Sequence, residues 1–207
     1  MRIKAYIFVL LAAALFVAST VPQAWAESMK SREYQIKAAF LYNFIKFVDW
    51  PEEKVADGNT PITIGIIGED PFGNAFEPIK DKKVKGAKII IKRFKGFEEP
   101  KKNNEKYKSE LHRNIKAIRK CRLLFICSSE KKNLGKIMNS VKKHNVLTVG
   151  EMKGFLESGG IINFLMEEKK LRFEINVATA RQAKLKISSK LLRLAKRIIQ
   201  EKQQKNE

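Results

Sequence analysis

The chain contains few side chains that commonly perform catalytic or metal chemistry, and their spacing keeps them apart. His112 falls in a charged segment and His144 in a predicted turn, and neither has a second ligand at metal-binding spacing. No Cys-x-x-Cys, His-Glu-x-x-His, nucleophile-elbow or phosphate-loop motif occurs. Acidic pairs such as Glu69-Asp70 lie in predicted loops, where solvation accounts for them. The sequence therefore predicts no catalytic residue, no metal site and no cofactor, and we expect a protein that binds rather than an enzyme.

The two cysteines bracket a predicted buried strand. In Cys121–Cys127 (CRLLFIC), a rise of about 3.3 Å per residue places the two Cα atoms about 20 Å apart. A disulfide spans no more than about 7 Å between Cα atoms. We therefore expect two buried free thiols. A bridge to a second molecule is the alternative in an oxidising compartment.

The first 26 residues have the order of a secretory signal peptide. A short positive start precedes the uncharged run Ala5–Val21, and Ala24 and Ala26 place small residues where a signal peptidase reads them. A retained membrane anchor is the alternative, but the run is at the short edge of the roughly 17–25 residues that cross a bilayer. We expect residues 1–26 to be removed and residues 27–207 to form one domain.

The composition is strongly basic. The formal net charge is +20, and loss of Arg2 and Lys4 with the leader leaves +18. Behind an export signal, this charge suits an anionic membrane face, an acidic partner or an anionic envelope polymer rather than nucleic acid. Solvated lysine-rich faces are an equal alternative. The segment Lys92–Lys120 is the most charged, with eleven basic and four acidic residues, and is predicted as a charged loop followed by a surface helix.

Apolar strands that alternate with amphipathic helices predict an α/β fold. We expect a single domain with a mixed, mostly parallel sheet flanked by helices, closed by a C-terminal β-hairpin and a terminal helix. The predicted strands are 62–67, 88–93, 123–127, 146–149 and 184–187, with hairpin arms 161–166 and 171–177. The predicted helices are 32–49, 72–77, 104–119, 128–142 and 152–156, and one from Ser188 onward.

The first predicted helix, 32–49, is apolar on two nearly opposite sides. The stripe that contains Phe40 and Phe44 is predicted to pack on the sheet. The other stripe needs a second layer or a partner, because one sheet face cannot cover both. We therefore predict a partner-binding surface, and packing within the core is the alternative. This surface consists of Tyr34, Leu41, Ile45 and Trp50.

A small ligand is a further expectation. Open α/β sheets bind ligands at the carboxyl ends of their strands, which here points to the turn at Gly68 or to the pair Gly159-Gly160. Arg172 and Asn176 lie on the polar side of the second hairpin arm and complete the predicted ligand-binding set.

Several segments, taken in order, are similar to the YfiR-type periplasmic proteins. The resemblance covers roughly Glu33 to Ala195, and a charged insertion before Cys121 departs from it. The segments are EYQIKAAFLYNFIKFVDWP, IIGEDPFG, CRLLFICSSE, VLTVGE, GGIINF and RFEINVATARQAKLKISSKLLRLA.

The resemblance implies a sheet flanked by helices and a periplasmic regulator without catalysis of its own. The best-understood members repress an inner-membrane diguanylate cyclase by holding its periplasmic sensor portion inactive, which affects cyclic-di-GMP signalling and biofilm formation. An outer-membrane-associated lipoprotein sequesters them under envelope stress. The expected partners are therefore the periplasmic part of such a cyclase, an outer-membrane lipoprotein, or a second copy in a homodimer. The alternatives are a periplasmic small-ligand sensor and a binder of anionic envelope components.

Export generates the first testable prediction. We expect cleavage after Ala26, because Ala24 and Ala26 fit the small subsites while Trp25 is free to be large. N-terminal sequencing of the exported protein should begin at Glu27. A chain that still begins at Met1 and partitions with membranes would contradict this expectation.

Overall fold

The computed structural model describes residues 28–51, 60–97 and 105–200. The predicted leader 1–26 with its predicted cleavage site, and the middle of the charged insertion, lie outside these residues. The strands are β1 (Val48–Asp49), β2 (Ile62–Ile67), β3 (Lys83–Val84), β4 (Ala87–Phe94), β5 (Leu123–Ile126), β6 (Leu147–Gly150), β7 (Ile162–Glu167), β8 (Lys170–Asn176), β9 (Lys186–Ile187) and β10 (Arg197–Ile199). The helices are an N-terminal helix over 28–47, α2 (Glu105–Ile118), α3 (Leu134–Val141), α4 (Val177–Gln182), α5 (Ser189–Leu192), and the short 3-10 helices η2 (Glu77–Ile79) and η3 (Ser128–Asn133).

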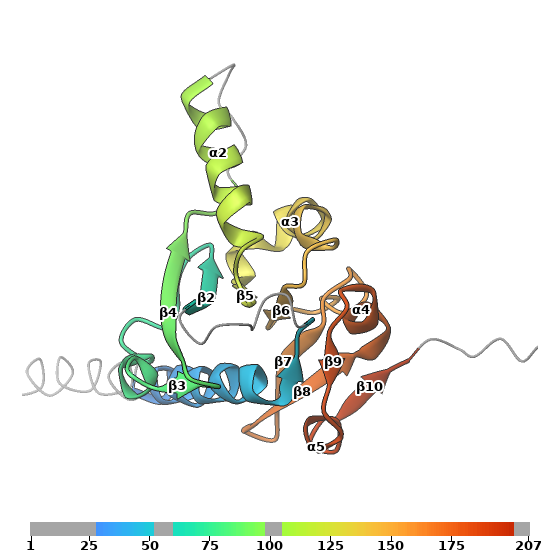
Figure 1. Cartoon of the computed structure of the whole chain (residues 1–207). Coiled ribbons are helices and arrows are strands. Elements are labelled where there is room, and N and C mark those ends of the chain that lie inside the picture. Colours follow the sequence, from blue (N-terminus) through green and yellow to red (C-terminus); the bar gives the residue numbers. More distant parts are fainter. Residues whose placement is uncertain (1–27, 52–59, 98–104, 201–207) are drawn as a thin grey trace, which may run out of the picture.

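An eight-stranded sheet in the order β10-β8-β7-β6-β5-β2-β4-β3 forms the centre of the molecule (Figure 1). The neighbours β4, β2, β5, β6 and β7 run parallel, and β8 returns antiparallel to β7 as the predicted hairpin. The antiparallel pair β1–β9 is a separate sheet. The predicted fold class, a mostly parallel α/β sheet with a C-terminal hairpin, is confirmed.

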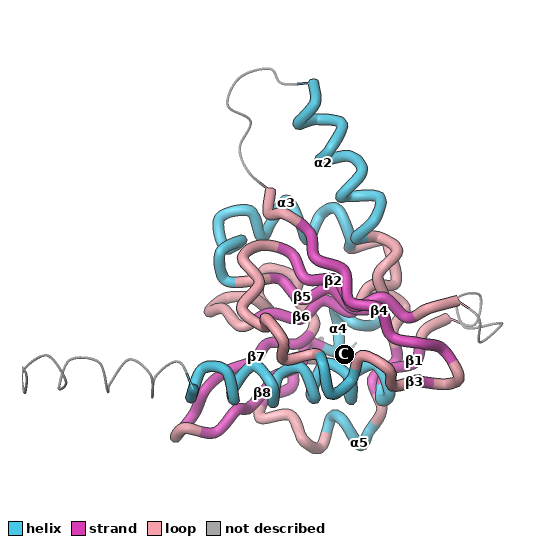
Figure 2. The backbone as a smooth tube through the Cα atoms, turned by 90° about the vertical axis from the view of Figure 1, so that its left-hand side faces the viewer, coloured by secondary structure: helices cyan, strands magenta, loops and turns pink. Residues whose placement is uncertain are grey.

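Helices cover both faces of this sheet. The N-terminal helix lies on one face, and α3 lies on the other together with the C-terminal end of α2, whose first turns project away from the sheet (Figures 1 and 2). Strands of continuous apolar sequence such as β5, whose four residues are all buried, are the expected centre of a sheet covered on both sides. In α3, the predicted inner residues are all buried, as expected: Leu134, Ile137, Met138 and Val141.

The N-terminal helix is held on the sheet by phenylalanines. Phe164 of β7 and Phe173 of β8 are direct cross-strand partners, so their side chains share one face. The Phe44 ring centroid lies 5.6 Å from that of Phe164 and 5.2 Å from that of Phe173. Phe40, one turn earlier, lies 5.9 Å and 5.7 Å from the same two rings. The helix is therefore anchored to the hairpin along two turns.

The side of this helix that we expected to face outward is buried, so its predicted orientation was wrong. Leu41 is fully buried, and Tyr34 and Ile45 are buried with it. The helix is covered on its flanks as well as from the sheet: Tyr34 contacts Phe72 after β2, and β9 pairs with β1 at the end of the helix. Two apolar stripes therefore merge into one wide inward face. Its residues are Tyr34, Lys37, Ala38, Leu41, Phe44, Ile45 and Val48.

The chain after Asn176 differs from the prediction. Asn176 caps the unpredicted helix α4 by accepting a hydrogen bond from the Thr179 amide. The predicted terminal helix does start at Ser188, but α5 ends at Leu192. The chain then forms β10, which pairs parallel with β8. Segments predicted as helices at 72–77 and 152–156 are turns, apart from η2.

Both cysteines are buried free thiols at the two ends of β5, as predicted. Burial raises the pKa of the Cys121 and Cys127 thiols to about 12. The reactive thiolate is therefore scarce at neutral pH, and both sulfurs behave as small apolar groups.

The burial of Leu41 is directly testable. Leu41→Ala should lower the free energy of unfolding by about 2–5 kcal/mol, because it removes methyl groups from a packed core. Ile36→Ala on the exposed side of the same helix should change it by less than about 0.5 kcal/mol. Urea unfolding measures both. Equal effects of the two substitutions would contradict the orientation of the helix.

Candidate functional site

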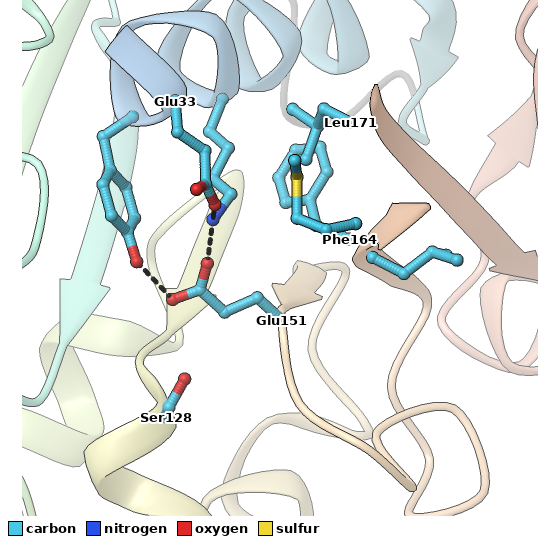
Figure 3. A pocket seen from close by; sticks show the side chains of 9 residues that line it. Glu33, Ser128, Glu151, Phe164 and Leu171 are labelled. Atoms are coloured by element: carbon cyan, nitrogen blue, oxygen red, sulfur yellow. Dashed lines mark hydrogen bonds and ion pairs between the residues drawn. The ribbon is translucent and has the colours of Figure 1, made fainter. Parts of the chain in front are cut away.

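A pocket of about 270 Å³ lies at the carboxyl edge of the sheet, next to the N-terminal helix (Figure 3). Ser128 follows β5 closely, and Glu151 follows β6 directly. Because these strands are parallel, their carboxyl ends meet at one edge, where α/β sheets place their sites. The lining residues are Glu33, Tyr34, Lys37, Ser128, Glu151, Phe164, Leu165, Met166 and Leu171.

A buried lysine joins the helix to this edge. Lys37 is only 3% exposed, and its ammonium forms ion pairs with Glu33, one helical turn earlier, and with Glu151. The ammonium also lies 4.2 Å from the centroid of the Tyr34 ring. A charge so deeply buried is tolerated only when it is paired. The pairing therefore fixes the first turns of the helix over the end of β6.

Tyr34 and β7 hold Glu151 in place. The Tyr34 hydroxyl donates a hydrogen bond of 2.9 Å to Glu151 Oε1. The next residue, Met152, donates its amide to Oδ1 of the buried Asn163 at 3.1 Å, which fixes the backbone beside Glu151. Burial, and then the negative charge of Glu151, raise the pKa of Tyr34 well above its ordinary value.

The opposite wall of the pocket is apolar, and exposed apolar side chains occur both on the β7–β8 hairpin and on the N-terminal helix. Met166 and Leu171 are the cross-strand pair nearest the hairpin turn on the face that carries Phe164. Ile36 lies one turn before Phe40, which contacts that face. Met166 is 51% exposed, Ile36 43% and Met29, two turns earlier, 66%. We call Met29, Ile36 and Met166 the helix–hairpin seam.

The polar groups of this pocket are paired with one another. Lys37 is engaged by two carboxylates, and the Tyr34 hydroxyl is occupied by Glu151. In the described ranges, no group of three His, Cys, Asp or Glu side chains is placed to hold a metal ion. A guest in the pocket would meet a charged wall and an apolar wall.

The predicted ligand residue Gly68 lies at the end of β2, where the strand order reverses. Its φ of +101° favours glycine, and an added Cβ would lie 2.5 Å from Ser129 Oγ. The Glu69 amide donates to the same hydroxyl at 3.0 Å. Ser129, at the start of η3, therefore fills the crevice at this point. The pocket lies between the ends of the next two strands, β5 and β6, at Ser128 and Glu151.

The other predicted ligand residues lie in different surroundings. Gly160 leaves room for the buried Phe155, whose ring would lie 2.2 Å from an added Cβ. Gly159 borders a separate cavity of about 30 Å³. Arg172 is exposed on β8, and Asn176 donates to the Leu156 carbonyl while it caps α4.

Trp50 lies away from the other predicted partner-binding residues. Its indole N–H donates to the Asn145 carbonyl at 2.9 Å, and Asn145 donates to the Ala183 carbonyl at 3.0 Å. The Arg122 guanidinium lies 5.8 Å from the centroid of the Trp50 ring. Trp50 therefore ties the end of the helix to the turn before β6.

Lys37 and Glu151 were missed in the sequence. Lys37 interrupts the apolar face that contains Tyr34 and Leu41, and such an interruption is a signal for a buried charge. Glu151 directly follows a buried parallel strand, where functional side chains collect. The two are 114 positions apart, so neither signal identifies the other.

Tyr34 provides a test by pH. Since its pKa is raised in the folded protein, folded Tyr34 keeps a proton that the unfolded chain loses above about pH 10. Stability should therefore fall as the pH rises beyond that value, and Tyr34→Phe should fall less steeply. Urea unfolding from about pH 8 to about pH 11 compares the two slopes. Both proteins share the two buried thiols, so parallel curves would contradict the environment of Tyr34.

Two solved structures are similar to this chain at low sequence identity. A conserved domain protein from Vibrio cholerae is 13% identical over 66% of this chain and 54% of that chain, with a TM-score of 0.45. An ABC domain from Streptococcus pneumonia in complex with L-Trp is 12% identical over 67% and 55%, with a TM-score of 0.46. The chain spans about half the length of these solved chains, and at such values the likeness carries no functional argument.

Three further findings concern the chain as a whole. No curated protein matches the chain. Within the described residues, every helix is too short or too polar to cross a membrane. The model of the YfiR/HmsC-like family matches residues 34–196, which include the β7–β8 hairpin, all strands of the large sheet except β10, and all residues that line the pocket except Glu33. The match covers well over half of the sequence, and the chain therefore belongs to the YfiR/HmsC-like family, a family of periplasmic regulatory proteins.

Proposed function

We propose that the protein represses an inner-membrane diguanylate cyclase by binding its periplasmic part. The family match over residues 34–196 carries this proposal, because the family is one of periplasmic regulators of such cyclases. Repression by binding needs a surface and no chemistry, which agrees with a pocket whose lysine and tyrosine are already paired. Its consequence would be lower cyclic-di-GMP and less biofilm.

The helix–hairpin seam is the surface that we propose for the cyclase. It presents three exposed apolar side chains, and Glu33 lines the pocket together with Met166, one of the three. An apolar centre with a charged rim is the usual composition of a protein interface. The seam replaces the buried Tyr34, Leu41 and Ile45 as the binding surface of the N-terminal helix.

The same surface suits the other proposed partners. An outer-membrane lipoprotein, or a second copy of the chain, that covered Ile36 and Met166 would exclude the cyclase from them. Sequestration would then be competition for one surface.

A small-ligand sensor is the second candidate function. The pocket of about 270 Å³ is near the lower end of the size of ligand pockets. Its apolar wall includes Met166, which also belongs to the seam. A bound small molecule would therefore alter the surface that the partner contacts.

The test uses cells that carry the cyclase. Deletion of the protein should raise cyclic-di-GMP, and Ile36→Asp or Met166→Asp should raise it to the same level, because a carboxylate in an apolar interface is not solvated. Their melting temperatures should stay close to that of the wild type, since both side chains are exposed. Leu194→Asp is the matched control, because Leu194 is also an exposed apolar residue and does not belong to the seam.

Two outcomes separate the parts of this proposal. Unchanged cyclic-di-GMP after deletion would contradict the function itself. A rise after deletion, with full repression by both Asp variants, would contradict the seam and leave the function in place.

A further inference from the structure

The edge formed by β3 and β4 carries a high density of positive charge. The segment Lys80–Lys95 holds eight basic residues, all exposed, and one acidic residue. Four of the basic side chains form ion pairs: Lys80 with Glu77, Lys85 with Asp49, Arg93 with Asp70 and Lys95 with Glu110. Within the described part of the chain, no carboxylate pairs with Lys83, Lys88 or Lys92.

These three lysines lie on one face of the sheet around an exposed isoleucine. Lys88, Ile90 and Lys92 alternate along β4 with Ile89, which is buried in the cluster beneath the N-terminal helix. They therefore point to the opposite face. Lys83 is the direct cross-strand partner of Lys88 and shares its face. We call Lys83, Lys88, Ile90 and Lys92 the β4 basic face.

The arrangement is unfavourable unless an anion lies against it. Like charges directly opposite each other across two strands repel, and Lys83 and Lys88 have this relation. Ile90 is 38% exposed in the middle of the three lysines. A phospholipid surface satisfies both features, because its phosphates attract the ammonium groups while an apolar side chain enters the headgroup boundary and lysine stems span it. A dissolved polyanion attracts the lysine ammonium groups but offers no apolar phase for Ile90.

We propose that the β4 basic face binds the anionic lipid surface of the membrane. The choice of membrane, the one that carries the cyclase, rests on the proposed function. By the alternation along β4, the β4 basic face lies on the side of the sheet opposite the N-terminal helix. Its strands, β3 and β4, form the end of the strand order remote from β7 (Figure 1). A protein bound in this way keeps the helix–hairpin seam free for its partner.

The experiment is co-sedimentation of the chain 27–207 with vesicles at low salt. Vesicles of about one-third phosphatidylglycerol and two-thirds phosphatidylcholine should bind the protein, and pure phosphatidylcholine should not. Each lysine near such a surface contributes about fivefold, so the double variant Lys88→Glu/Lys92→Glu should bind at least about 25-fold more weakly. The variant should fold, because both positions are exposed and the carboxylate introduced at position 88 would face Lys83 with opposite charge.

The matched control is Lys186→Glu/Lys190→Glu, which makes the same charge change at two exposed lysines on β9 and α5. It should bind close to the wild-type level. If the control loses as much binding as the β4 variant, the attraction is diffuse and the β4 basic face is not the site. Absence of binding to the anionic vesicles would also overturn the proposal.

Ile90→Ser distinguishes a membrane from a dissolved polyanion. It should weaken vesicle binding severalfold and leave the elution of the protein from a heparin column unchanged, because heparin has no apolar phase. An unchanged vesicle affinity for Ile90→Ser would assign the face to polyanions and overturn the lipid proposal. Repression in cells that survives the loss of vesicle binding would leave the proposed function standing, whereas the deletion experiment tests that function separately.

Discussion

The packing of the N-terminal helix against the β7–β8 hairpin is the interaction on which the rest of the structure depends. Phe40 and Phe44 contact Phe164 and Phe173 over two helical turns. Because a helix is rigid over that length, the hairpin also determines where Lys37 and Tyr34 meet Glu151. The pocket and the seam are thus consequences of one aromatic contact between the start of the domain and its C-terminal hairpin.

The buried ion pairs of Lys37 fix the position of the N-terminal helix more than they stabilise the fold. Removing two charges from water costs about as much as their attraction returns, whereas removal of one partner leaves an unpaired buried charge. Lys37 therefore specifies a single placement of the helix over the end of β6. The apolar contacts of the helix would tolerate a small shift of the helix. The same shift would break the ion pair between the Lys37 ammonium and Glu151.

Much of the fold could be predicted because its central strands are continuous apolar runs and α3 has one clear inner side. The orientation of the N-terminal helix could not, since periodicity shows which residues are apolar but not how far the rest of the chain wraps around them. Phe72 on one flank and Ile187 near the end supplied the extra cover. Ile198 and Ile199 fit a helical stripe equally well, and only the free edge of β8 turns them into a strand. The site depended on Lys37 and Glu151, whose relation exists only after folding.

The two cysteines at the ends of β5 make the order of events during export important. In the unfolded chain, nothing holds Cys121 and Cys127 apart, and a bridge between them would close a small ring. That ring could not extend into β5, which contacts both β2 and β6 in the middle of the sheet. Oxidation before folding would thus remove a central strand, whereas folding first buries both sulfurs. In a compartment that forms disulfides, the chain must therefore fold faster than its thiols are oxidised. A slowly folding variant would accumulate as a misfolded monomer that contains a Cys121–Cys127 disulfide.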